Sequence, residues 1–131
     1  MKDTFVQKFL LIAVMALFAQ FSVAQDNAAN MAAAKQIADI VVSLNHFPSD
    51  ADKATLGAIS GNMELTEGLR AMASAVTNIQ HAATAEGKSA MAALQAAADT
   101  PDRGKALAGV IENLNHMASA DAKAQLAQMF P

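Results

Sequence analysis

The chain has 131 residues, of which 16% are charged, and it contains no cysteine. Without cysteine the protein has neither a disulfide framework nor the lipid attachment point of a lipoprotein, so packing alone must hold its fold together. The formal net charge of -3 argues against a general nucleic-acid binder, which requires a basic surface.

Residues 1–24 are predicted to be a secretory signal peptide. Lys2 and Lys8 provide a basic start, residues 9–21 form an apolar run, and Ser-Val-Ala at 22–24 places small residues where signal peptidase cuts. The apolar run is shorter than the roughly 20 residues of a transmembrane helix, so an uncleaved anchor is the less favoured alternative. We expect a periplasmic or secreted mature chain, residues 25–131, that forms a single domain without a membrane span.

A spacing of 35 residues relates many positions of the mature chain. The only three histidines, His46, His81 and His116, lie at this spacing. Charged, small and bulky residues recur in the same register: Lys35, Arg70 and Lys105; Ala38, Ala73 and Ala108; Val41, Val76 and Ile111. This recurrence predicts three helix-turn-helix hairpins, residues 27–61, 62–96 and 97–131. The fold is therefore expected to be all-α, with the hairpins either stacked as a short solenoid or closed into a compact helical bundle.

Each hairpin is predicted to have a longer first helix and a shorter second helix, each with one apolar face. Apolar residues in the first helices recur at the i, i+3, i+4, i+7 spacing that places them on one face. They are Ile37, Ile40, Val41 and Leu44; Met72, Ala75, Val76 and Ile79; Leu107, Val110, Ile111 and Leu114. The second helices contribute Leu56 and Ile59, Met91 and Leu94, and Leu126 and Met129. Alanine supplies 28 of the 107 mature residues, which favours helix formation and close approach of helices.

The turn within each hairpin carries recognisable signals. In the first hairpin Pro48 stops the first helix and Ser49 is placed to cap the second. Thr84 and Ser119 occupy the equivalent capping position. At the repeat boundary, Gly61-Asn62 is expected to provide a left-handed helix end. In the middle hairpin Gly87 indicates a looser turn, so residues 66–98 could instead form one kinked helix in a five-helix bundle.

Three interpretations of the histidines remain open. In the first, each lies in the last turn of its helix and interacts favourably with the helix dipole. In the second, stacked hairpins align a stripe that recognises an acidic or carboxylate-bearing partner, most strongly at acid pH. The stripe consists of Lys35, His46, Arg70, His81, Lys105 and His116. In the third, His46, His81 and His116 bind a metal ion, which requires the hairpins to close around a pseudo-threefold axis.

The repeated lysines Lys53, Lys88 and Lys123 begin the second helices, where a positive charge opposes the helix dipole. We expect them to reach back to the free carbonyl groups that end the preceding helix.

The sequence favours a binding or interaction module over an enzyme. No nucleophile with a base, no phosphate-binding loop and no paired acids nominate a catalytic site. No cofactor is expected, since Cys-x-x-Cys-His is absent and the methionines are accounted for as core residues.

The expected partner is an unidentified protein or small acidic ligand, and not nucleic acid. The alternative is a bundle that sequesters a metal or small ligand. Terminal apolar residues near Met129 and Phe130 further suggest a homodimer.

Overall fold

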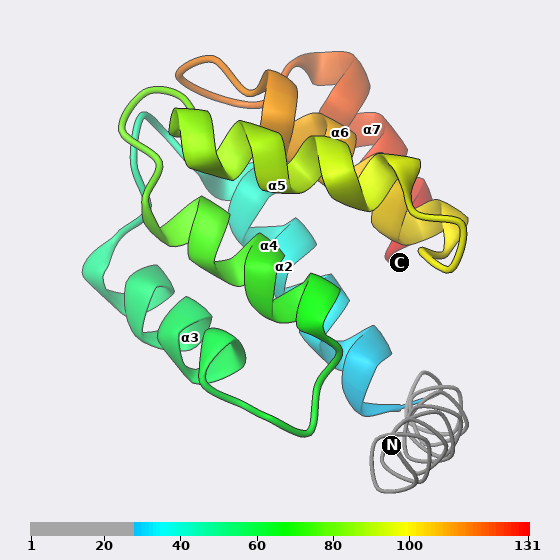
Figure 1. Ribbon diagram of the computed structural model, residues 1–131. Helices are drawn as coiled ribbons and strands as arrows, with labels where there is room; N and C mark the ends of the chain where they lie inside the picture. Colours follow the sequence, from blue (N-terminus) through cyan, green and yellow to red (C-terminus); the bar gives the residue numbers. More distant parts are fainter. Residues whose placement is uncertain (1–27) are drawn as a thin grey trace, which may run out of the picture.

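The computed structural model describes residues 28–131, which fold into six helices (Figure 1). The predicted signal peptide lies outside the described residues. The all-α class and the three predicted hairpins are confirmed, and none of the six helices is long and apolar enough to cross a membrane. The hairpins are α2 (Ala29–Ser43) with α3 (Asp50–Ser60), α4 (Glu67–Thr77) with α5 (Ala85–Ala96), and α6 (Asp102–Asn113) with α7 (Ala120–Met129).

The three hairpins close into a ring instead of stacking as an open array. The first helices α2, α4 and α6 contact one another in all three pairings and form the inner layer. Each second helix packs against the first helix of the next repeat, α3 on α4, α5 on α6, and α7 on α2. The contact of α7 with α2 joins the third repeat to the first. Of the two predicted arrangements, the molecule therefore adopts the closed bundle.

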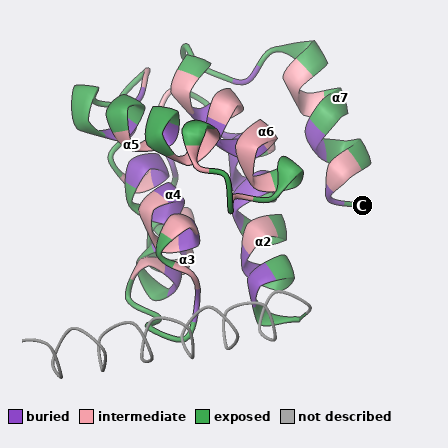
Figure 2. Cartoon of the chain, turned by 45° about the vertical axis from the view of Figure 1, so that its right-hand side comes forward, coloured by how far each residue is buried: buried purple, intermediate pink, exposed green. Residues whose placement is uncertain are grey.

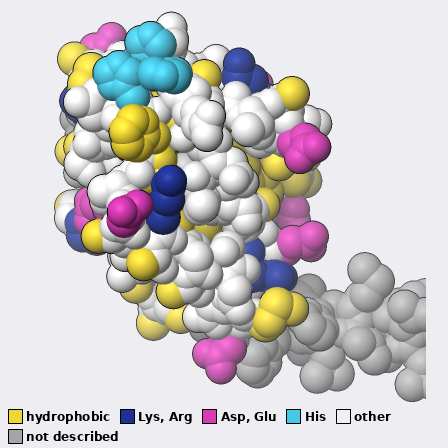
Figure 3. All heavy atoms as spheres, turned by 90° about the vertical axis from the view of Figure 1, so that its left-hand side faces the viewer, with side chains coloured by type: hydrophobic (Ala, Val, Ile, Leu, Met, Phe, Trp, Pro, Cys, Tyr) yellow, Lys and Arg dark blue, Asp and Glu magenta, His cyan; other side chains and the backbone are white. Residues whose placement is uncertain are grey.

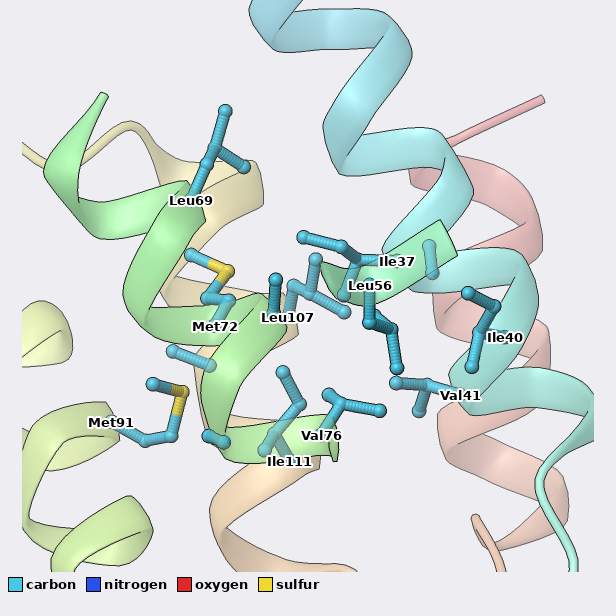
Figure 4. Close-up of a cluster of buried hydrophobic side chains, with 14 of the residues drawn as sticks. Ile37, Ile40, Val41, Leu56, Leu69, Met72, Val76, Met91, Leu107 and Ile111 are labelled. Atoms are coloured by element: carbon cyan, nitrogen blue, oxygen red, sulfur yellow. The ribbon is translucent and has the colours of Figure 1, made fainter. Parts of the chain in front are cut away.

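The core is built around equivalent residues of the three inner helices, and Leu56, Met91 and Leu126 from the second helices complete it (Figures 2 and 4). Side chains 35 residues apart point toward one another around the pseudo-threefold axis, and eleven of the twelve predicted first-helix positions are buried. The exception, Val110, is half-buried. Ala38, Ala73 and Ala108 are at most 1% exposed, so their small side chains let the inner helices approach closely. The equivalent buried residues are Ile37, Met72 and Leu107; Val41, Val76 and Ile111; and Leu44, Ile79 and Leu114.

Capping residues begin the second helices as predicted. The hydroxyl groups of Ser49, Thr84 and Ser119 accept hydrogen bonds from the backbone N–H groups three residues later, at 3.1, 3.0 and 3.1 Å. The predicted loosening at Gly87 is wrong, because its N–H donates to Thr84 like its counterparts and α4 and α5 are separate helices. A Cβ at Gly87 would lie 3.3 Å from Oγ1 of Thr84, so glycine leaves room for the capping hydroxyl group.

Two further predictions about the hairpin ends are corrected by the structure. Gly61 has φ -89°, so it is right-handed, and none of the described glycines has a positive φ. Phe130 is only 6% exposed, so this part of the terminal face, which was expected to be free, is covered. The predicted reason for dimerisation through this end of the chain therefore does not hold.

Removing the cap of α7 tests the role of the turns in closing the ring. We expect Ser119→Ala to lower the free energy of unfolding by about 1 kcal/mol, because the N–H of Ala122 loses its acceptor. Urea unfolding followed by circular dichroism measures this change. Ser89→Ala is the matched control, since Ser89 is exposed within α5 and alanine favours helix. Equal stability of the two variants would contradict the capping role.

Candidate metal centre

Each inner helix ends in a turn whose backbone is strained at the histidine. His46, His81 and His116 have φ values of 70°, 69° and 68°, and they are the only non-glycine residues with positive φ in residues 28–131. The N–H of Phe47 donates to the carbonyl of Asn45 at 2.8 Å, and Met117 donates to Asn115 at the same distance. Such a bond across a central residue with φ near +70° defines a γ-turn of the rare, strained kind.

The three turns are joined by a closed ring of backbone hydrogen bonds. The N–H of His46 donates to the carbonyl of His116 at 2.6 Å, that of His81 to His46 at 2.6 Å, and that of His116 to His81 at 2.5 Å. Every histidine therefore donates one bond and accepts another within the ring. This cycle fixes the three Cα positions around the pseudo-threefold axis at one end of the bundle.

The ring of backbone bonds places the three imidazoles together. Ring centroids are 5.1 Å apart for His46 and His81, 5.1 Å for His46 and His116, and 5.0 Å for His81 and His116. One nitrogen from each ring lies within 4.8 Å of those from the other two. His46 is half-buried while His81 and His116 are exposed, and Figure 3 shows the histidines as one continuous patch at the surface.

A neighbouring amide sets the tautomer of His46. Its Nδ1 lies 2.6 Å from Oδ1 of Asn45. Because an amide oxygen can only accept, Nδ1 carries the hydrogen and the free lone pair lies on Nε2. Asparagine or glutamine also precedes the other histidines, as Gln80 and Asn115. Orientation of an imidazole by hydrogen bonding through its second nitrogen is characteristic of metal-binding histidines.

The three turns carry no charge. Residues 44–49, 79–84 and 114–119 include no Asp, Glu, Lys or Arg. The imidazoles are therefore the only ionisable side chains of the three turns, and no carboxylate within a turn is available to pair with them.

The structure separates the two groups of residues in the predicted stripe. Lys35, Arg70 and Lys105 each lie eleven positions before a histidine, which corresponds to at least about 16 Å along the chain. Lys35 forms an ion pair with Asp39 at 3.2 Å, and Arg70 contacts the sulfur of Met63 at 3.3 Å. The basic side chains on the face shown in Figure 3 lie outside the histidine patch.

The histidines do not lie in the last helical turn, which corrects the predicted dipole interaction. In the first hairpin α2 ends at Ser43, and Leu44 already has extended backbone angles. His46 therefore lies beyond the helix, in a turn of its own.

The repeated lysines do not make the predicted contact, and the bonds they do make near the turns are ordinary helical bonds of the backbone. The backbone N–H groups of Lys53, Lys88 and Lys123 donate to the carbonyls of the capping residues Ser49, Thr84 and Ser119 at 2.8, 2.8 and 2.9 Å. Among the described residues, no lysine ammonium forms a hydrogen bond to a carbonyl that ends a helix.

Sequence reasoning missed the left-handed histidines and the ring of bonds that they form. One signal in the sequence could have predicted this ring. The same turn occurs three times at a constant interval, and three equivalent turns can meet around a threefold axis. Comparisons with known protein families, with curated proteins and with solved structures found no match. The function is therefore argued from the geometry of this site.

Glycine and alanine at a histidine position measure the backbone strain separately from the side chain. We expect His81→Gly to be at least as stable as the unmodified protein, because glycine adopts positive φ at little cost. We expect His81→Ala to be less stable than His81→Gly by about 1 kcal/mol, since an L side chain is strained there. Urea unfolding without metal measures both.

The neighbouring Gln80 provides the control, because its φ is not positive and its side chain is exposed. At this position alanine is expected to be at least as stable as glycine, the reverse of the order at His81. The same order at both positions would contradict the account of strain.

Proposed function

We propose that this protein binds a divalent transition-metal ion through His46, His81 and His116. The observation that supports this proposal is the convergence of three imidazole nitrogens within 4.8 Å of one another. Neutral imidazole is a favourable ligand for zinc, copper, iron and nickel. A site with three histidines and remaining open positions is a known arrangement for zinc.

The three imidazole rings need to move only a short distance to bind one ion. Zinc–nitrogen bonds of about 2.0–2.1 Å in tetrahedral geometry place the three nitrogens about 3.3–3.4 Å apart. An ion at the centre of the present triangle would be no more than about 2.8 Å from each nitrogen, so each ring needs to approach by less than about 1 Å. Side-chain rotation of the two exposed histidines can supply such a movement without a change in the backbone ring.

The backbone strain also favours a functional interpretation. Non-glycine residues held at positive φ cost about 1–3 kcal/mol each, and they concentrate at ligand-binding and active sites. A turn that served only to connect two helices would be more stable with glycine at this position. The chain instead has a histidine at all three strained positions. Metal binding accounts for both the residue type and its repetition.

The proposed role is binding or sequestration without catalysis. Apart from the three histidines assigned to the ion, no acidic or basic side chain occurs in the three turns to act as a general acid or base. With a signal peptide predicted over residues 1–24, we place this role in the periplasm or outside the cell. The stripe with Lys35, Arg70 and Lys105 stays an alternative prediction for an acidic partner.

Isothermal titration with zinc and nickel tests the site. We expect saturable binding that His81→Ala abolishes or weakens at least tenfold, because two imidazoles remain. A metal concentration of 100 times Kd is expected to raise the free energy of unfolding by about 2.7 kcal/mol. The triple variant Lys35→Ala, Arg70→Ala, Lys105→Ala keeps all histidines and should bind metal as before. A loss of metal binding in that variant, with the fold intact, would contradict a site formed by the histidines alone.

The amide next to His46 provides a finer test. We expect Asn45→Ala to weaken metal binding by about 10–100-fold, because the Nδ1–H loses the acceptor that orients the ring. Asn78→Ala is the control, since the Asn78 side chain bonds to a helix carbonyl at 2.9 Å instead. Equal affinities of both variants would exclude an orienting role for Asn45.

A further inference from the structure

The histidine cluster is bordered by apolar side chains, and the two large ones are exposed. The residue after each histidine is Phe47, Ala82 or Met117, and we call these three residues the rim. Phe47 is 59% exposed and Met117 is 46% exposed, which makes them two of the four large apolar side chains exposed in the described part of the chain. An apolar border around an exposed ligand cluster indicates a surface that another molecule covers.

The coordination geometry leaves the outer side of the ion open. Three imidazoles from one ring of turns occupy positions on one side of a metal ion. The remaining positions face away from the bundle, on the side where His81 and His116 are exposed. Nickel and cobalt ions accept six ligands, so three further donors arranged with threefold symmetry would complete such a site.

A second copy of the same chain meets these requirements. It carries three imidazoles with matching pseudo-threefold symmetry, and its rim is apolar in the same places. Because the turns contain no charged residue, apposing two copies brings no like charges into contact there. A twofold axis perpendicular to the pseudo-threefold axes allows the two sets of rings to be staggered around one ion.

We propose that two copies of this chain share one six-coordinate metal ion, with His46, His81 and His116 of each copy on opposite sides. This inference rests on the proposed metal binding. Phe47 and Met117 of each copy would then be covered by the other. Twelve residues of the three turns are not buried, compared with about 20–30 residues on each side of a standard interface. The contact is therefore too small to be stable alone, and association requires the ion.

Analytical ultracentrifugation during titration with nickel chloride tests this proposal. The expected result is a monomer without metal, complete conversion to a dimer at about 0.5 equivalents of nickel per chain, and return to monomer after addition of a chelator. A monomer that binds one nickel ion per chain would overturn the shared site while leaving the proposed metal binding intact. Absence of bound nickel and zinc, measured by elemental analysis after desalting, would overturn both proposals.

Variants at the rim separate dimerisation from metal binding. We expect Phe47→Asp and Met117→Asp to keep metal binding and to form at least tenfold less dimer, because the carboxylates are pressed together in the interface. Met63→Asp is the matched control: Met63 is 76% exposed and lies between hairpins, away from the turns that hold the histidines, so its dimer is expected to be unchanged. A dimer that persists in His81→Ala, or that forms without metal, would overturn a shared ion as its cause.

Discussion

The closed ring of hydrogen bonds among the backbones of His46, His81 and His116 is the constraint on which the candidate site depends. Three donors and three acceptors are satisfied only if all three turns meet at one point, which in turn requires the hairpins to close. The contact of α7 with α2 completes that closure from the side of the core. Packing of the inner helices and bonding of the turns therefore support the same pseudo-threefold arrangement.

Under the proposed metal binding, the cluster exchanges backbone stability for the placement of three imidazoles. Positive φ at three histidines lowers stability, while buried layers such as Val41, Val76 and Ile111 hold the inner helices in place. Packing of the helical bundle therefore offsets the free-energy cost of the strained turns. What the strain provides is a set of imidazoles that project from adjacent points of one ring, a geometry that a helix surface does not offer. Under the proposal, the turns without Asp, Glu, Lys or Arg and the apolar rim determine which partner can approach these imidazoles.

Much of the fold follows from local patterns in the sequence. Local patterns predict the 35-residue period and the apolar faces of the helices. They also predict the capping positions of Ser49, Thr84 and Ser119, because each cap depends only on residues close to it in the sequence. Closure depends on contacts between distant repeats and therefore stayed an open alternative. The histidines illustrate the limit best, because a helical projection assigns them to a helix that has already ended. A glycine was expected to be left-handed at Gly61, and the structure instead places that conformation at histidine.

X-ray absorption spectroscopy of the zinc-loaded protein tests the central claim most directly, because it reports the atoms bound to the ion. The account predicts scattering from at least three imidazole rings, with nitrogens at about 2.0–2.1 Å from zinc. The same spectrum with His81→Ala should lose the contribution of one ring or show no bound ion. A first shell composed of oxygen atoms, or of a single imidazole, would contradict the convergence of the three histidines on one metal.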